Sequence, residues 1–132
     1  MRHRKKGRKL GRKNGNRRAL LMNLASQLVI YKRIKTTDAK AKELRSFIEP
    51  LVSLAKKDDL HSRRMVIRKL PHKNIVGTLF KEIAPKFVDR PGGYTRIIKL
   101  GYRDNDRAPV SIIEFVDMVE ISTSEEKETD AS

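Results

Sequence analysis

The sequence predicts an α+β domain in which about four helices pack with a small, mostly antiparallel sheet. Apolar residues recur at helical spacing through the first two thirds of the chain, whereas β-branched and aromatic residues dominate the last third. Both ends are strongly charged and poor in apolar residues. We therefore divide the 132 residues into a basic arm (1–18), one α+β domain (19–118) and an acidic tail (119–132) that we expect to be disordered.

The first two helices are predicted from apolar periodicity. The first spans residues 17–31, and the second begins after Thr37, a favourable N-cap residue. Pro50 lies inside the second helix and predicts either a kink near residues 47–50 or a break into two pieces. The apolar stripe of this helix consists of Ala41, Leu44, Ile48, Leu51, Val52 and Ala55.

Two shorter helices are predicted next, and each is followed by a proline. The third spans residues 60–70 and the fourth spans residues 74–84. Proline disfavours the helical conformation in the residue that precedes it. We therefore expect the third helix to stop at Pro71 and the fourth to end before Pro85.

The strands are predicted from β-branched and aromatic residues. Residues 94–102 and 110–116 form a predicted hairpin around the turn-prone sequence at 104–106. Residues 31–37 supply a short additional strand before the second helix. Together these segments account for the small sheet.

The charge balance points to a polyanionic partner. The net charge is +15, the pI is about 10.4, and residues 19–118 alone carry +9. Nucleic acid is therefore the first partner to consider. Cysteine is absent, which excludes disulfides and thiolate zinc sites and fits a reducing, cytoplasmic compartment. No apolar run reaches the length of a membrane span, and the basic start lacks the pattern of a secretory or transit signal.

The arm is the most basic segment of the chain. Its eighteen positions hold ten lysines and arginines, no acidic residue, and Leu10 as the one large apolar residue after Met1. Repulsion between like charges keeps such a segment extended in isolation, with a reach of about 60 Å at roughly 3.3 Å per residue. We expect the arm to become ordered when it binds a polyanion.

Two further segments are candidates for RNA contact, and each has a competing interpretation. Arg63, Arg64 and Arg68 form either a phosphate-facing ridge or an ordinary solvated helix face. In residues 89–96, two glycines permit close backbone approach and Tyr94 is placed to stack on a base or ribose. The alternative is a tight turn in which Tyr94 covers the sheet edge. The double glycine lacks the further glycines and following helix of a nucleotide-binding loop.

Catalysis is not supported by the sequence. His3, His61 and His72 have no carboxylate or second histidine at ligand spacing. The acidic pairs at 58–59 and 104–106 are typical of a helix start and a turn. We expect no enzyme activity, metal, cofactor or small-molecule substrate. A histidine-based nuclease would require metal-dependent cleavage that is lost when His61 or His72 is replaced.

Three segments of the chain resemble a known family: MRHRKKGRKLGRKNGNRRALLMNLASQLV, IKTTDAKAKELRSFIEPLVSLAK and RPGGYTRIIKLGYRDNDRAPVSIIEFVD. Together they resemble the bacterial large-subunit ribosomal protein L17 family over about residues 1–118. The resemblance implies a protein bound to large-subunit ribosomal RNA on the solvent side, near the exit of the peptide tunnel, with other ribosomal proteins as neighbours. It implies a role in architecture and assembly. The acidic tail has no fixed counterpart in the family.

The resemblance and the charge pattern together define the residues that we expect to face RNA. They are Arg2, His3, Arg4, Lys5, Lys6, Arg8, Lys9, Arg12, Lys13, Asn14, Arg17, Arg18, Lys35, Lys42, Arg45, Arg63, Arg64, Arg90, Tyr94 and Arg96. A nucleoid-type DNA-binding protein is the main alternative, because a basic arm and a basic helix also suit DNA. Neither dimer-forming heptads nor helix-turn-helix spacing is evident in the sequence.

Overall fold

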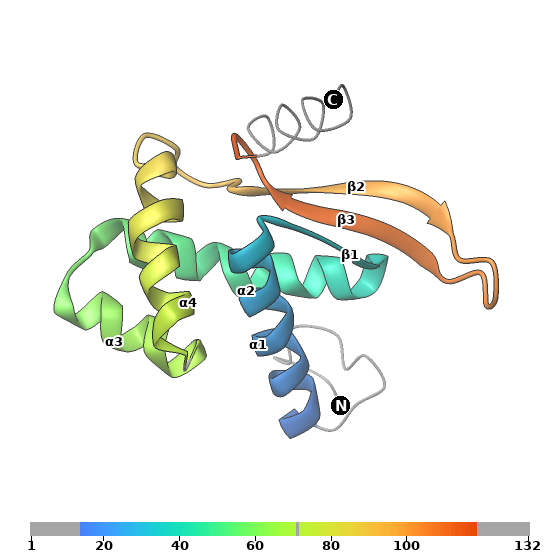
Figure 1. The fold of residues 1–132 in the computed structure, drawn as a ribbon, viewed down its shortest axis with the longest axis horizontal. Helices are drawn as coiled ribbons and strands as arrows, with labels where there is room; N and C mark the ends of the chain where they lie inside the picture. Colours follow the sequence, from blue (N-terminus) through green and yellow to red (C-terminus); the bar gives the residue numbers. More distant parts are fainter. Residues whose placement is uncertain (1–13, 71, 119–132) are drawn as a thin grey trace, which may run out of the picture.

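The structure is a computed structural model that describes residues 14–70 and 72–118 (Figure 1). Its elements in chain order are α1 (Asn14–Tyr31), β1 (Arg33–Thr37), α2 (Asp38–Lys57), α3 (Leu60–Lys69), α4 (Lys73–Thr78), the π-helical turn η1 (Leu79–Ile83), the 3-10 turn η2 (Ala84–Phe87), β2 (Thr95–Tyr102) and β3 (Pro109–Phe115). The central helix α2 contacts all three strands as well as α1, α3, η1 and η2. The predicted α+β fold class is confirmed.

The three strands form one antiparallel sheet in the order β1-β3-β2. Arg33 of β1 pairs with Glu114, and Thr95 of β2 pairs with Phe115. The predicted hairpin and the predicted additional strand are therefore both confirmed. The last strand among the described residues, β3, is the central strand of the sheet, which the sequence pattern did not indicate.

Alternation of side chains gives the sheet two different faces. Ile34, Ile97 and Ile113 lie opposite one another on the three strands and pack toward the core. Lys35 pairs with Ile112 on the other face, which points away from α2. One face of the sheet is thus part of the core, and the second carries cations and partly exposed apolar residues.

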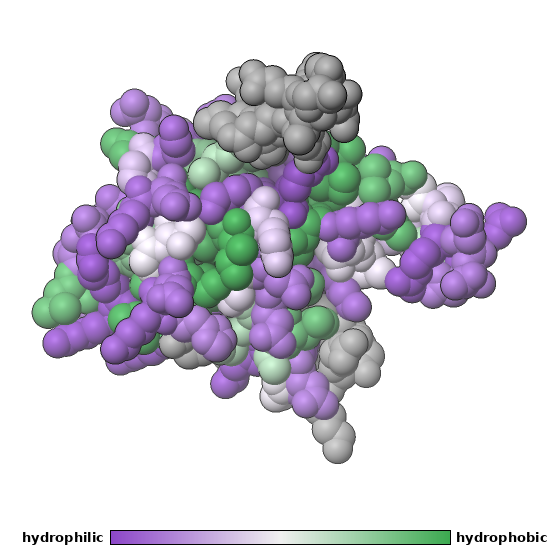
Figure 2. Space-filling view, viewed as in Figure 1, coloured by the Kyte–Doolittle hydropathy of each residue, from purple (hydrophilic) through white to green (hydrophobic). Residues whose placement is uncertain are grey.

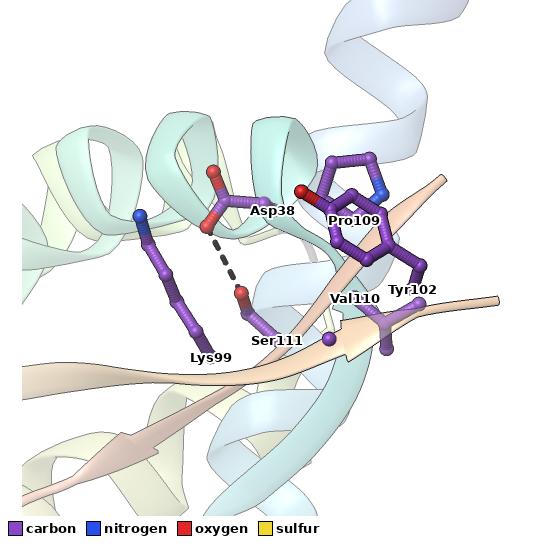
Figure 3. A pocket seen from close by; sticks show the side chains of 7 residues that line it. Asp38, Lys99, Tyr102, Pro109, Val110 and Ser111 are labelled. Carbon is purple, nitrogen blue, oxygen red and sulfur yellow. Dashed lines mark hydrogen bonds between the residues drawn. The ribbon is translucent and has the colours of Figure 1, made fainter. Parts of the chain in front are cut away.

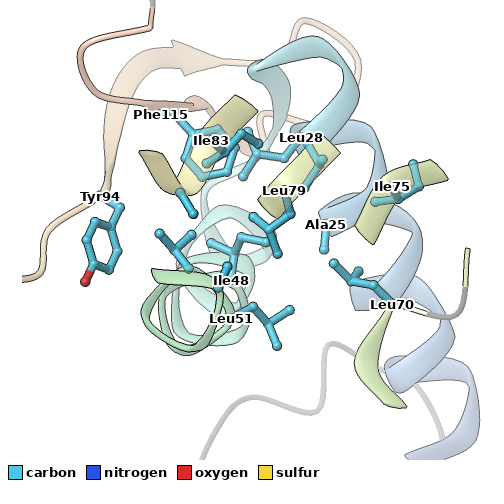
Figure 4. Close-up of a cluster of buried hydrophobic side chains, with 14 of the residues drawn as sticks. Ala25, Leu28, Ile48, Leu51, Leu70, Ile75, Leu79, Ile83, Tyr94 and Phe115 are labelled. Atoms are coloured by element: carbon cyan, nitrogen blue, oxygen red, sulfur yellow. The ribbon is translucent and has the colours of Figure 1, made fainter. Parts of the chain in front are cut away.

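The core is centred on α2 (Figure 4). All six residues of its predicted stripe are buried: Ala41, Leu44, Ile48, Leu51, Val52 and Ala55. Leu28 of α1 and Phe115 of β3 join the same cluster. Phe87 packs between two rings, with centroid distances of 5.3 Å to Tyr94 and 6.2 Å to Phe115. Such aromatic pairs each add about 1 kcal/mol beyond their buried area.

The structure corrects two of the helix boundaries predicted for the N-terminal half of the chain. α1 begins at Asn14, three residues before the predicted start, because the weak helix formers asparagine and glycine are tolerated in a first turn. The final part of the predicted arm, which includes Arg17 and Arg18, is therefore helical. The rest of the arm and the acidic tail lie outside the described residues.

α2 continues through Pro50 as one helix, so the predicted break is wrong. Burial of the stripe on both sides of Pro50 offsets the roughly 3 kcal/mol that an interior proline costs.

The predicted end of the fourth helix is also wrong. The chain remains helical beyond Pro85, passing from α4 through η1 into η2. Pro85 falls in the first turn of η2, where the missing amide hydrogen is not needed. This extension carries Phe87 into the core, where it is fully buried.

Candidate nucleic-acid interface

The described cations that follow α1 and that the sequence predicts to face RNA fall into two groups. Four form ion pairs: Lys42 with Asp38 at 3.1 Å, Arg63 with Asp58 at 2.8 Å, Arg90 with Asp117 at 3.1 Å and Arg96 with Glu114 at 2.5 Å. Lys35, Arg45 and Arg64 are exposed and form no ion pair with a described residue. An ion pair offsets part of a cation's charge. The second group therefore attracts a phosphate more strongly.

Arg96 and Arg33 flank the carboxylate of Glu114 on the sheet face that points away from α2. Arg96 Nε donates to Glu114 Oε1 at 2.5 Å, and Arg33 Nε lies 3.6 Å from Oε2. The side chain of Glu114 is 1% exposed, so the two guanidinium groups compensate a buried negative charge. Arg96 thus has a structural role. Arg33 is absent from the predicted set because only strand pairing places it opposite Glu114.

The segment that leads into β2 is fixed to α2 by two charged side chains. Glu49 accepts hydrogen bonds from the amides of Tyr94 and Thr95 at 3.1 and 3.0 Å and from the Thr95 hydroxyl at 2.8 Å. Lys56 donates to the carbonyl oxygen of Arg90 at 2.5 Å and to the Tyr94 hydroxyl at 3.0 Å. These bonds hold the double-glycine segment in a defined conformation.

The fold brings Arg45 beside this segment. Arg45 on α2 lines a hollow of about 410 Å³ together with Gly92 and Gly93. Gly93 has a positive φ of 63°, and a Cβ atom at either glycine would meet nothing within 4 Å. This φ favours glycine at position 93, and the space beside both glycines is open. The geometry therefore permits an RNA backbone to approach closely beside Arg45. The contact itself stays a prediction.

Tyr94 does not have the role that the sequence suggested. Its side chain is 1% exposed and lies against Phe87, with the hydroxyl 3.1 Å from Ser53 Oγ. Burial raises the pKa of Tyr94, but hydrogen bonds with Lys56 and Ser53 outweigh this effect, so the pKa lies below its ordinary value. The predicted stacking of Tyr94 on a base is wrong, because the ring is part of the core.

The three arginines of α3 do not share one environment. Arg63 lies 4.9 Å above the ring of Phe80 and pairs with Asp58, so it is directed toward the neighbouring helical segment. Arg64 and Arg68 are exposed and one turn apart, as predicted. Figure 2 shows hydrophilic residues spread across much of this view of the molecule. The phosphate-facing ridge is therefore reduced to Arg64 and Arg68, and it stays a prediction.

The N-terminal end of α1 carries basic residues at a positive helix end. Arg17 and Arg18 lie in the first two turns, and the first turn contains no acidic residue. The helix macrodipole adds a partial positive charge at the same end. This end of α1, from which the arm leads away, is suited to a phosphate group.

The β2-β3 hairpin contains residues that sequence reasoning missed. Tyr102 is 73% exposed and lines a hollow of about 200 Å³ with Lys35 and Arg103. Arg103 forms two hydrogen bonds to Asp106, at 3.0 and 2.6 Å, which lower the pKa of Asp106 to about 2. The sequence feature that could have identified Tyr102 was its position at the end of a predicted strand, beside a predicted polar turn.

The described residues contain no group of three or more potential metal ligands, and none of their helices is long and apolar enough to cross a membrane. His61 lies in the first turn of α3 and His72 precedes α4, and both are exposed. His3 lies outside the described residues. No catalytic arrangement involving His61 or His72 is therefore apparent in this part of the chain.

An α+β domain with exposed cations on several elements is typical of a protein that binds a polyanion. The family model for ribosomal protein L17 matches residues 20–116. The chain is 50% identical over 117 residues to the large ribosomal subunit protein bL17 of Syntrophotalea carbinolica, covering 89% of this chain and 76% of that protein. This chain therefore belongs to the ribosomal protein L17 family. The resemblance predicted from the sequence is confirmed, and membership of a ribosomal protein family also confirms that the protein is not an enzyme.

Proposed function

We propose that this protein is a structural constituent of the large ribosomal subunit, where it binds and stabilises large-subunit ribosomal RNA and supports assembly and translation. The proposal is carried by the exposed cations Lys35, Arg45 and Arg64, which lie on β1, α2 and α3 without an ion pair among the described residues. Contacts distributed in this way fit the phosphates of a folded RNA better than one small acidic ligand. Neighbouring large-subunit proteins are further partners, and the cytoplasmic ribosome is the location.

The body and the arm contribute to binding in the same physical way. Each phosphate contact releases counterions, so six to ten contacts reduce affinity by roughly three to five decades between 50 and 200 mM salt. The body carries +9 and the first eighteen residues carry ten further cations. The proposed arm contacts are Arg2, His3, Arg4, Lys5, Lys6, Arg8, Lys9, Arg12 and Lys13, continued by Asn14, Arg17 and Arg18 at the start of α1.

The ion-paired cations contribute less in this proposal. Lys42, Arg63, Arg90 and Arg96 already interact with carboxylates, so an RNA phosphate must compete with an existing partner. They stay candidate contacts because each side chain is at least 41% exposed. We expect them to adjust orientation on the RNA more than overall affinity.

A charge-matched pair of variants tests the proposal on large-subunit ribosomal RNA. Replacement of Lys35, Arg45 and Arg64 by glutamine should lower the slope of log affinity against log salt by about 2 to 3. The control replaces Lys42, Arg63 and Arg103 by glutamine, which removes the same charge from ion-paired positions and should lower the slope less. Equal slopes for the wild-type protein and the first variant would contradict the proposal.

Location and nucleic-acid preference are tested separately. The protein should sediment with large subunits in a gradient-fractionated lysate, and recovery only in the free protein pool would contradict the proposal. Duplex DNA at the same phosphate concentration should compete poorly with ribosomal RNA. Equal competition would favour the nucleoid alternative.

A further inference from the structure

The β2-β3 hairpin extends beyond the third strand of the sheet. β1 pairs with β3 only from Val110 to Glu114, whereas β2 continues its pairing to Tyr102 and Pro109. The tip of the hairpin therefore projects from the body (Figure 1). Tyr102 lies on this projecting part and is 73% exposed.

A bulge in β2 determines the direction of Tyr102. Lys99 pairs with Ser111 and Tyr102 pairs with Pro109, and the register shifts between Lys99 and Gly101. Ser111 and Pro109 are two residues apart and lie on the same face of the sheet, so their partners Lys99 and Tyr102 also share that face. In a regular strand, residues three apart would point to opposite faces. Gly101 adopts a φ of 112°, which favours glycine at the bulge.

A hollow lies beside the bulge, next to the start of α2 (Figure 3). Its volume is about 290 Å³, and its lining is formed by the hairpin and by Asp38 of α2. Tyr102 and Pro109 supply one wall, and Val110 lies beside them. The other wall contains Asp38 and Lys99, which makes the hollow apolar on one side and polar on the other.

The polar wall is organised before any ligand arrives. Asp38 Oδ1 accepts a hydrogen bond from Ser111 Oγ at 2.9 Å, and Asp38 Oδ2 lies 3.1 Å from Lys42 Nζ. The hydrogen bond from Lys42 and then that from Ser111 lower the pKa of Asp38, so its carboxylate is charged at neutral pH. A fixed carboxylate accepts hydrogen bonds from amino and imino groups and repels a phosphate.

This combination matches an unpaired nucleobase. A base has a flat π face that stacks on tyrosine and an edge that carries hydrogen-bond donors. Lys99 lines this hollow and Arg107 lies in the adjoining turn, whereas Lys35 lies on the other face of the sheet, in a second hollow that Tyr102 also lines. All three are exposed and form no ion pair with a described residue, so they are available to the phosphates on either side of the base. An isolated exposed tyrosine would need no explanation. Tyr102 is distinguished by the formed hollow and by the cations around it.

We propose that Tyr102 stacks on one unpaired base of large-subunit ribosomal RNA, held in the hollow between Pro109 and Asp38. This inference rests on the proposed function, because it assigns one specific contact within the RNA-binding surface. The hairpin thus supplies the aromatic contact that the sequence assigned to Tyr94.

The test compares tyrosine variants in equilibrium binding to large-subunit ribosomal RNA over a range of salt concentrations. Tyr102→Ala should weaken binding about 5- to 100-fold, the size of one lost stacking contact, with an unchanged salt slope because no phosphate contact is lost. Tyr102→Phe should bind like the wild type, since the ring is retained. Tyr31→Ala is the matched control, because Tyr31 is 66% exposed and lies beyond the opposite end of β1 from the hollow.

The outcomes separate this inference from the proposed function. If the wild-type protein binds the RNA but Tyr102→Ala binds equally well, the stacking contact is refuted and the proposed function stands. If the wild-type protein fails to bind, both are refuted. An equal loss in Tyr31→Ala, or a changed slope in Tyr102→Ala, would also overturn the stacking contact. A photoreactive phenylalanine analogue at position 102 should crosslink to RNA in purified subunits, and crosslinking only to a neighbouring protein would overturn the inference.

Discussion

A tyrosine directly before β2 and a tyrosine at its last position lie in opposite environments. Before the strand, Tyr94 is buried and is held by Glu49 and Lys56 of α2. At the far end, Tyr102 lies on a hairpin that extends beyond β1 and is 73% exposed. The difference shows that a tyrosine beside glycine and arginine is accessible to a ligand only when no neighbouring element covers it.

Alanine substitutions at the two tyrosines should have the largest and most unequal effects on folding. Tyr94→Ala removes a buried ring that packs on Phe87, and it should lower the free energy of unfolding by about 4 kcal/mol. Tyr102→Ala should change it by less than about 0.5 kcal/mol, because the ring is mostly in solvent. Chemical denaturation measures both values. Similar losses for the two variants would contradict the contrast.

Glu49, which holds the backbone of Tyr94, should contribute nearly as much to the free energy of unfolding. Glu49→Ala leaves the amides of Tyr94 and Thr95 without their acceptor and should lower the free energy of unfolding by about 3 kcal/mol. The control is Glu82→Ala, which removes an exposed ion pair with Lys32 and should cost less than about 1 kcal/mol. Denaturation midpoints that coincide for the two variants would show that Glu49 does not hold the segment that leads into β2.

Single cations beside the two regions should have a moderate effect on RNA binding. Arg45→Gln, beside the anchored loop, and Arg107→Gln, in the hairpin, should each lower the salt slope by about 1 if each side chain contacts one phosphate. Neither change should alter the thermal melting temperature, because both side chains are exposed. An unchanged salt slope for one variant would show that this arginine does not contact a phosphate.

Acid should produce the smallest and most local effect, at the hairpin tip. Hydrogen bonds from Arg103 and from the Ala108 amide lower the pKa of Asp106 to about 2, below the roughly 3.9 of an unfolded aspartate. The contribution of Asp106 to the turn is therefore fully present above about pH 4 and is lost as the pH falls through about 2. Amide chemical shifts of residues 103–108 should follow this titration. In Asp106→Asn the same amides should show no such transition.

Much of the fold followed from local patterns, because those patterns recur in the tertiary structure. The stripe from Ala41 to Ala55 predicted the buried side of α2, and the turn-prone sequence after Tyr102 predicted the hairpin. The prolines were less reliable guides. Pro50 does not break α2, and Pro85 does not end the helical segment, since packing of the surrounding apolar residues outweighs a local preference.

The candidate site was predictable in its chemistry and less so in its geometry. The excess of lysine and arginine, the family motifs and the exposure of Arg64 and Arg68 could be inferred from the chain. The pairing of Arg96 with Glu114 could not, because it depends on which residues face each other across two strands. The bulge that directs Tyr102 also depends on strand register.

The sequence by itself determined the class of fold, the polyanionic character of the partner and the family. These properties depend on composition, periodicity and ordered motifs, which are local. Only the tertiary structure decided that Tyr94 is a core residue, that β3 is the central strand, and that Tyr102 and Asp38 lie around one hollow. The physical reason is that burial and pairing join residues distant in sequence, and the free energy of those contacts exceeds the local preferences that a sequence displays.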